Sequence, residues 1–407
     1  MNDFIFENRT KVYFGAGCVS KYLPDILTQY GNTVLLGYGS GSIKQNGVYD
    51  EVVSILTEAG KTVIEFGGIM SNPTLEKMLE GTEIARANDV DLILAVGGGS
   101  VMDCCKSISI AARYAGDVWN DFWEEQGTLN FDPVPLGMIV TMPATGSEVN
   151  GSAVLTNTER NIKTDRDYPR SNADFALMDP NYTLSMPLRQ LRAGTFDILS
   201  HIMETYFSYP IEDNVSDDIS EALMRGVIRD LRAALADPND YQARSNIMWE
   251  ASMAENRIIK MGKSKDFEVH NIEHQISAYT NCNHGEGLAV LHPTYYRHIY
   301  KDGLGKFVKF AERVWGLDRA DYVSDDALAL AGIDALADFI RDVGLPTTLR
   351  DLGIKDELIE LGINSQVDSF GTVKDGLRVI AESCYTTPGA YREIDKAEIF
   401  EILRECY

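Results

Sequence analysis

The sequence predicts an α/β protein: an N-terminal Rossmann-like domain with a parallel sheet, followed by an all-helical C-terminal domain. Three observations support this fold class. Short apolar runs alternate with helical patterns over about the first 180 residues, and glycine-rich loops follow two of those runs; after residue 185 the strand patterns nearly vanish. Strands that alternate with helices form βαβ units, which build a parallel sheet. We place the domain boundary so that the domains cover 1–183 and 184–407.

The predicted strands are short, apolar and rich in β-branched residues. In chain order they cover 33–37, 62–66, 91–96 and 135–142. Between them, apolar residues recur with a period close to 3.6, which predicts helices. These helices cover 44–59, 74–88 and 101–114. Nearer the N-terminus, 4–6 and 12–14 flank a polar segment, and we expect these two segments to pair as a hairpin.

The second half shows long helical patterns. The first three cover 191–206, 217–236 and 245–259, and several more follow residue 305. The turn-rich segment DPNYTLSMP separates them from the strands. All six histidines lie in this half, between His201 and His298. We therefore expect the chemistry of the histidines to belong to the helical domain.

The chain is acidic, with 61 Asp and Glu against 37 Lys and Arg and a net charge of −24. This charge opposes binding to nucleic acids and to anionic membrane surfaces, so we expect neither as a partner. No run of 18 apolar residues is present, so no transmembrane helix is predicted. The six cysteines are scattered without a C-x-x-C pair, and the N-terminus lacks the apolar core of a signal peptide. These features favour the cytoplasm.

Two glycine-rich loops follow predicted strands, at 37–42 (GYGSGS) and at 97–100 (GGGS). Glycines let the backbone approach a phosphate, and the helix that follows presents free N–H groups to it. Two such loops at successive strand ends favour a dinucleotide over a lone phosphate. The 37–42 loop contains no acid that would meet a ribose 2′-hydroxyl, and Lys44 lies close behind it. We therefore predict NADP(H) in preference to NAD(H).

Five potential metal donors occur at helical spacing or next to it. Asp197 and His201 are four residues apart in FDILSH, His270 and His274 are four apart in VHNIEH, and His284 follows in NCNHGEG. Residues four apart share one face of a helix. Mixed imidazole and carboxylate donors suit a divalent ion such as Zn²⁺ or Fe²⁺. The remaining histidines, His292 and His298, lie beyond this group, and we interpret them as structural.

Two classes of enzyme fit these residues. In a metal- and nicotinamide-dependent oxidoreductase the ion polarises an alcohol or carbonyl oxygen, whereas in a metallohydrolase it activates water. The glycine loops favour the oxidoreductase, because a hydrolase needs no dinucleotide. A non-catalytic nucleotide sensor would leave the histidine group without a role.

Longer motifs carry a resemblance to a known family. They are GSGSIKQNGVYDEV (39–52), FGGIMSNPTLE (66–76), LAVGGGSVMDCCK (94–106), TMPATGSEVN (141–150), LMDPNYT (177–183), FDILSHIMETY (196–206) and HNIEHQISAYTNCNHGEGLAVLHP (270–293). With them the chain resembles the iron-containing (group III) alcohol dehydrogenases over essentially its whole length. Within that family it is most similar to the butanol dehydrogenase-like branch of NADPH-dependent aldehyde reductases.

The resemblance implies a role for individual residues. The metal ligands of the family fall on Asp197, His201, His270 and His284, and His274 falls where a histidine near the substrate would relay a proton. Lys163 aligns with a lysine that supports NADP(H) in the aldehyde-reductase branch. The other cofactor contacts implied by the family are Gly39, Ser40, Asn72, Gly98, Gly99, Ser100, Asp103, Thr141, Thr145 and Ser147.

The family also implies a fold, a reaction and an assembly. The fold is the dehydroquinate synthase-like one, with a dinucleotide-binding domain followed by a helical metal and substrate domain, and the proteins are usually dimers. The reaction expected here moves hydride between NADP(H) and a small primary alcohol or aldehyde such as butanol or butanal. Because the same fold serves several reactions, an NAD-dependent polyol dehydrogenase of the glycerol or propanediol type is the alternative. The donor set accepts either Fe²⁺ or Zn²⁺.

Overall fold

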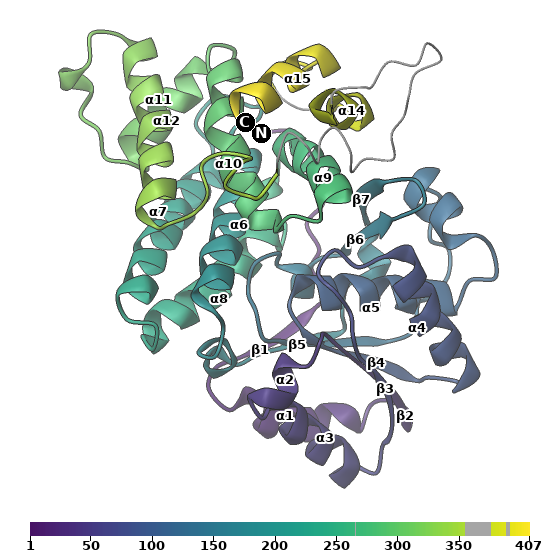
Figure 1. Ribbon diagram of the computed structural model, residues 1–407. Helices are drawn as coiled ribbons and strands as arrows, with labels where there is room; N and C mark the ends of the chain where they lie inside the picture. The colour runs from purple at the N-terminus through teal and green to yellow at the C-terminus, as the bar shows by residue number, and fades with distance from the viewer. Residues whose placement is uncertain (265, 355–375, 388–390) are drawn as a thin grey trace, which may run out of the picture. The chain divides into compact units, whose positions relative to one another are not determined.

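The computed structural model describes residues 1–264, 266–354, 376–387 and 391–407 (Figure 1). The chain forms two compact units. The sheet unit consists of Glu7–Pro187 and Asp237–Asn256. The helical unit consists of Met1–Phe6, Leu188–Ala236 and Arg257–Tyr407.

A six-stranded sheet forms the centre of the sheet unit, and all its neighbouring strands are parallel. Its order is β1-β8-β5-β4-β2-β3. The strands are β1 Lys11–Phe14, β2 Thr33–Tyr38, β3 Thr62–Phe66, β4 Leu92–Gly97, β5 Leu136–Val140 and β8 Phe175–Met178. Beside it, β6 Ser152–Asn157 and β7 Ile162–Asp167 form an antiparallel pair. The predicted parallel-sheet fold class is confirmed.

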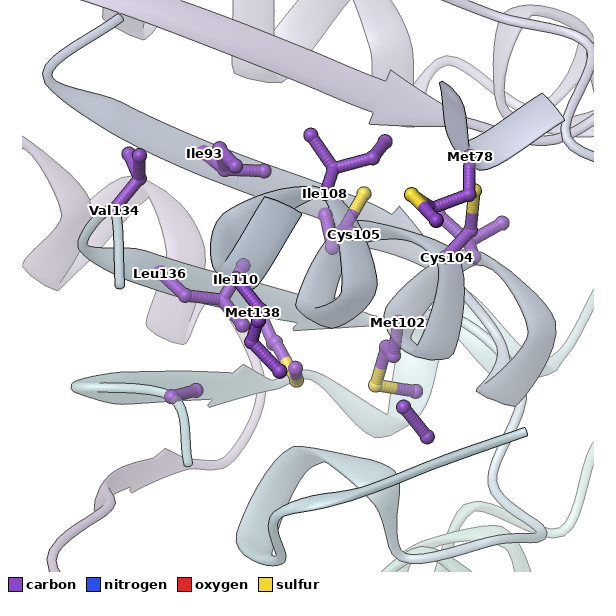
Figure 2. Packing of buried hydrophobic residues seen from close by; sticks show 14 of the residues in the cluster. Met78, Ile93, Met102, Cys104, Cys105, Ile108, Ile110, Val134, Leu136 and Met138 are labelled. Carbon is purple, nitrogen blue, oxygen red and sulfur yellow. The ribbon is translucent and has the colours of Figure 1, made fainter. Parts of the chain in front are cut away.

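Helices cover both faces of the sheet. Helices α1 (Cys18–Leu27) and α3 (Val48–Glu58) contribute to one apolar cluster, and α4 (Leu75–Ala87) and α5 (Gly99–Ala112) to the other. Figure 2 shows side chains of α5, among them Cys105 and Ile108, beside Ile93 of β4. Because α5 is buried along most of its length, Cys104 and Cys105 lie inside the core. Both are free thiols.

The strand order creates a site where ligands commonly bind. From β2 the chain moves outward to β3 and then returns to the other side of β2 as β4. At such a reversal the loops after the two inner strands diverge and leave a crevice at their carboxyl ends. Those loops are 37–42 and 97–100, so the fold brings both glycine-rich loops to this reversal.

The helical unit is built around α6 Leu188–Tyr206, in which nearly every residue from Leu191 onward is buried. Helices α7 and α10 pack against α6, and α9 packs against α10. The helices of this unit are α6, α7 Val215–Ala236, α9 Glu268–Thr280, α10 His284–Ile299, α11 Leu304–Arg313, α12 Asp325–Asp342, α14 Gly376–Ser383 and α15 Lys396–Glu405. Among the residues described, no helix is both long and apolar enough to cross a lipid bilayer.

Several elements differ from the sequence prediction. The predicted hairpin is wrong: residues 4–6 are not in a strand, and β1 pairs in parallel with β8 instead. The predicted helix 44–59 is divided into α2 Ser42–Gln45 and α3, because Gly47 between them has φ +84°. Helix α8 Tyr241–Glu255 belongs to the sheet unit. The division into domains 1–183 and 184–407 stays a prediction.

Short helical turns complete the described chain. They are η1 Trp119–Glu124, η2 Ser147–Val149, η3 Pro169–Ser171, η4 Pro180–Thr183, η5 Ile258–Lys260 and η6 Arg319–Asp321.

Candidate metal centre and cofactor loops

Three helices of the helical unit carry the predicted metal donors. Asp197 and His201 lie one turn apart on α6, and His270 lies in the first turn of α9. His284 is the first residue of α10. Asn283 caps α10, since its side chain accepts a hydrogen bond from the Glu286 amide, which fixes where the helix starts.

The carboxylate of Asp197 stands at the centre of this group. Its Oδ1 is 3.7 Å from His201 Nδ1, 3.7 Å from His270 Nε2 and 3.6 Å from His284 Nε2. These distances are too long for hydrogen bonds. They match donors that share one ion, because two ligands each about 2.1 Å from a tetrahedral centre lie about 3.4 Å apart.

The hydrogen bonding of these buried atoms supports the same interpretation. Asp197 Oδ1 and His270 Nε2 are buried and have no hydrogen-bond partner among the described residues. A buried polar atom without a partner is costly, so a pair of such atoms facing each other needs an explanation. A divalent cation bound between them would satisfy both. The donors of Asp197, His201 and His270 lie within 4.8 Å of one another, so the residues present fit such an ion.

Two buried glutamates lie behind the histidines. Glu204 Oε2 is hydrogen-bonded to His270 Nδ1, and Glu273 Oε2 is hydrogen-bonded to His284 Nδ1. Each ring therefore turns its Nε2 toward Asp197. Metal-binding imidazoles are commonly oriented in this way, by a carboxylate on the second nitrogen. Neither glutamate is among the residues predicted from the sequence.

A second group of potential donors consists of Glu273, His274 and His284, again within 4.8 Å of one another. We assign Glu273 to the orientation of His284 and not to a second ion, because its carboxylate is already hydrogen-bonded to that ring. His274 is buried, and its ring centre is 5.4 Å from that of His284 and 6.1 Å from that of His270. It thus lies beside the rings of two proposed ligands.

Without an ion, the electrostatics of the centre favour a protonated His270 and an ionised Asp197. Burial disfavours the charged form of His270, but Glu204 and Asp197 outweigh it and raise the pKa of His270 to about 10. Burial likewise disfavours the Asp197 carboxylate, yet His201 and His284 outweigh it and lower the pKa of Asp197. A metal must displace the proton from His270, so its binding should strengthen as the pH rises.

The last two histidines lie outside the centre. His292 is fully buried, and its Nε2 is 2.7 Å from Ser200 Oγ. His298 pairs with Glu398 at 3.0 Å and with Glu405 at 3.3 Å. Each of these histidines has a partner that accounts for its position, as expected for structural residues.

In the sheet unit, backbone hydrogen bonds join the loops at the carboxyl ends of the strands. The amide of Gly68 donates to Gly39 O (3.0 Å), and that of Thr141 donates to Gly97 O (3.0 Å). At the second junction a Cβ on Gly99 would lie 2.5 Å from the Thr145 side chain, so glycine is required there. Gly98 precedes α5 and has no side chain to cap it. The first N–H groups of α5 therefore suit a phosphate group.

Several predicted cofactor residues occur on these joined loops, and others support them. Ser40 is exposed, and Gly39, Ser100 and Thr141 are partly exposed. Asp103, in contrast, is buried: its carboxylate accepts hydrogen bonds from Ser147 Oγ (2.6 Å) and from the Val154 amide (3.1 Å). In the structure Asp103 therefore ties α5 to the 145–149 segment and to β6.

Two more of the predicted residues lie on neighbouring segments. Lys163 on β7 is buried and pairs with Thr156 on β6, and Thr156 forms a bridge with Thr74. Asn72, at φ +53°, precedes Thr74 by two residues. The fold thus connects Asn72 and Lys163 through one strand, although they are far apart in the sequence.

Comparisons with known proteins agree with this architecture. Residues 9–180 match the family model described as iron-containing alcohol dehydrogenase, and residues 192–407 match the C-terminal model of the same family. The NADH-dependent butanol dehydrogenase A of Clostridium acetobutylicum is 36% identical, and the match covers all of both chains. The NADPH-dependent aldehyde reductase YqhD of Escherichia coli is 34% identical over 86% of this chain and 89% of its own.

A solved structure gives the same result for the fold. The crystal structure of NADH-dependent butanol dehydrogenase A from Thermotoga maritima superposes with a TM-score of 0.89 at 30% identity. It covers 100% of this chain and 99% of its own.

Proposed function

The chain belongs to the iron-containing alcohol dehydrogenase family and is an oxidoreductase, and from this premise we propose that it interconverts small aldehydes and primary alcohols such as butanal and butanol. One observation carries the proposal: three imidazole nitrogens lie 3.6–3.7 Å from a buried Asp197 oxygen. We propose Asp197, His201, His270 and His284 as the metal ligands. The names of the two relatives with butanol and aldehyde activity support the substrate class.

The protein's own residues prepare the reaction. When bound, a divalent ion would polarise the substrate oxygen and NADP(H) would exchange the hydride. Glu204 and Glu273 keep the rings of His270 and His284 turned toward Asp197. His274, beside the proposed ligands, would deliver the proton that the substrate oxygen takes up when hydride reduces the carbonyl carbon, and would remove it in the reverse direction.

The glycine-rich loops are the proposed dinucleotide site. Gly39, Ser40, Asn72, Thr141 and Thr145 would contact the cofactor, and the start of α5 at residues 98–100 would hold its phosphates. Asp103 and Ser147 would act by holding these loops in position. Lys163 would contribute a positive charge for the 2′-phosphate of NADP(H).

Finer properties are proposed as well. We propose a preference for NADP(H), supported by Lys44 and Lys163 and by the NADPH-dependent relative; the relative that is 36% identical uses NADH. We propose Fe²⁺ or Zn²⁺ as the ion, since both accept these donors. A homodimer in the cytoplasm completes the proposal, following the resemblance to the family.

The test is activity after controlled loading with metal. Anaerobically purified protein is stripped with a chelator, reconstituted with Fe²⁺ or Zn²⁺, and assayed for butanal reduction with NADPH and with NADH. His270→Ala should lose both metal and turnover, whereas His274→Ala should keep the metal and lose turnover. If reconstituted wild-type protein oxidises neither cofactor with any small aldehyde, the proposed function is wrong. Faster turnover of glycerol or 1,3-propanediol with NAD⁺ would favour the polyol alternative.

A further inference from the structure

A lysine–glutamate ion pair, flanked by two tyrosines, lies beside the first glycine-rich loop. Lys44 Nζ is 3.1 Å from Glu65 Oε2, and Tyr38 Oη donates a hydrogen bond of 2.7 Å to the same oxygen. The ammonium also lies over two aromatic rings, 4.8 Å from the centre of Tyr38 and 4.2 Å from that of Tyr49. We call these four residues the Lys44 cluster.

Two residues of the Lys44 cluster lie at the carboxyl ends of two neighbouring strands, and the other two, Lys44 and Tyr49, lie on α2 and α3. Tyr38 is the last residue of β2, and Glu65 is the penultimate residue of β3, paired in register with Leu36. The Ile69 amide donates to Tyr38 O (3.2 Å), which ties the two strand ends together. In this topology, an acid at the end of the strand that follows the first glycine loop meets the ribose of a bound dinucleotide.

The 37–42 loop itself contains no acid, but the fold brings Glu65 next to it. Hydrogen bonds from Tyr38, Tyr49 and Lys44 lower the pKa of Glu65 to about 2, so its carboxylate is charged at neutral pH. The Lys44 and Glu65 side chains are 44% and 47% exposed, so a ligand can reach both. One group attracts a phosphate, and the other repels it.

We propose that Lys44 contacts the 2′-phosphate of NADP(H) and that Glu65 restrains this contact, so that the pair sets the preference between NADP(H) and NAD(H). The inference rests on the proposed dinucleotide function. Binding of a 2′-phosphate requires Lys44 to share or leave its partner. A ligand with a free 2′-hydroxyl makes no such demand, and its hydroxyl can donate a hydrogen bond to the Glu65 carboxylate. Neither residue is among the cofactor contacts that the family resemblance supplies.

The experiment compares two nucleotides that differ only at the 2′ position. Binding of adenosine 2′,5′-bisphosphate and of adenosine 5′-monophosphate to the full-length protein is measured by calorimetry. Glu65→Gln should tighten the bisphosphate about three- to tenfold and leave the monophosphate unchanged or slightly weaker. Lys44→Met should weaken the bisphosphate by a similar factor, and the double variant should lose the gain seen with Glu65→Gln alone.

A matched ion pair controls for the general effect of charge. Arg86 and Glu83 on α4 are also 3.1 Å apart and exposed, so Glu83→Gln removes the same charge elsewhere in the sheet unit. It should change neither affinity. Equal changes for both nucleotides in Glu65→Gln, no change, or no nucleotide binding at all would overturn the proposal. Failure of the proposed function is recognised separately, as wild-type protein that binds these nucleotides yet reduces no aldehyde.

Discussion

At the scale of single residues, the metal centre depends on side chains that would not touch the metal. His270 and His284 each have one nitrogen on a buried glutamate and the other facing Asp197. A glutamate on Nδ1 fixes both the orientation of the ring and the nitrogen that carries the proton. Without this glutamate, the imidazole would populate several orientations, and only some of them would direct a nitrogen at the metal.

We therefore predict that Glu204→Gln weakens metal binding by about 10- to 100-fold. The amide can still accept a hydrogen bond, but it is a weaker acceptor than the carboxylate and no longer fixes the tautomer of the metal-binding ring. Competition with a metal-binding dye gives the affinity. Glu221→Gln, which removes the charge of another buried carboxylate of the helical unit, one that accepts a hydrogen bond from Tyr206, is the control and should leave metal affinity unchanged. Equal losses in the two variants would contradict the orienting role.

A second residue, His292, predicts how stability depends on pH. Burial lowers its pKa to about 3, whereas an unfolded histidine titrates near 6.5. Between these values the unfolded state binds a proton that the native state does not, so the free energy of unfolding falls as the pH falls. The maximum slope is about 1.4 kcal/mol per pH unit.

His292→Gln should remove this contribution. In urea unfolding of chelator-treated protein between pH 6.5 and 4.5, the variant should show a shallower loss of stability than the wild type. The variant should also be less stable at pH 7.5, because the bond to Ser200 is disturbed. An unchanged slope would show that His292 is protonated in the native state.

The residues differ in how far sequence could reveal them. Asp197 with His201, and His270 with His274, could be predicted as candidate donors because a spacing of four on a helix needs no knowledge of the fold. The choice of His270 and not His274 as a ligand came only from the family resemblance. Glu204 and Glu273 carry a weaker signal: each follows a proposed ligand by three residues on the same helix. A glutamate in a helix is usually a solvent-exposed residue, and only tertiary packing shows that these two are fully buried.

At the scale of elements, the start of α10 depends on one close contact. A Cβ on Gly285, next to His284, would lie 2.1 Å from the carbonyl oxygen of Ala193 on α6. Glycine thus allows the two helix backbones to approach, and this approach holds His284 near Asp197. Interiors are close-packed, so a methyl group here must separate the helices.

Gly285→Ala should therefore lower stability by roughly 1–3 kcal/mol and weaken metal binding. Gly305→Ala is the matched control, because Gly305 also lies in a helix of this unit and its Cβ would have ordinary contact with Ile211 at 3.8 Å. The control should be neutral or slightly stabilising. Thermal unfolding without metal, followed by metal titration, measures both effects, and a Gly285→Ala protein as stable as the control would refute the contact.

Elements with local signals were predicted, and those defined by distant pairing were not. Strands β2, β3 and β4 coincide with apolar runs, and the apolar residues of α4 and α5 recur with the helical period. Both types of element could therefore be predicted from the sequence. The partner of β1 could not, because it lies about 160 residues away in β8. The short exposed segment at 4–6 offered a nearer partner, and sequence alone cannot weigh a near pairing against a distant one.

For the whole molecule, the two proposed ligands have separate binding residues. The metal donors all belong to the helical unit and the glycine-rich loops to the sheet unit. A ligand stabilises the structure that binds it, by about 2.7 kcal/mol at a concentration 100 times its dissociation constant. Metal removal should therefore speed amide hydrogen exchange in α6, α9 and the start of α10, and leave β2, β4 and β5 unchanged.

Binding of NADP⁺ should act on the sheet unit instead, and should slow amide hydrogen exchange at residues 37–42 and 97–100. Hydrogen exchange followed by mass spectrometry resolves these segments. A uniform change through both units on removal of the metal would contradict the separate assignment of the two ligands.

Helix α8 has a consequence for how this protein is made. It returns to the sheet unit after the chain has already entered the helical unit, and there Ser252 bonds to Glu148 and Trp249 meets Phe14. During synthesis, residues 7–187 therefore emerge as an incomplete sheet unit, which residues 237–256 complete only later. A fragment that ends at residue 187 would expose the surface that α8 covers. Expression of either unit alone requires a rearranged gene, not a simple truncation.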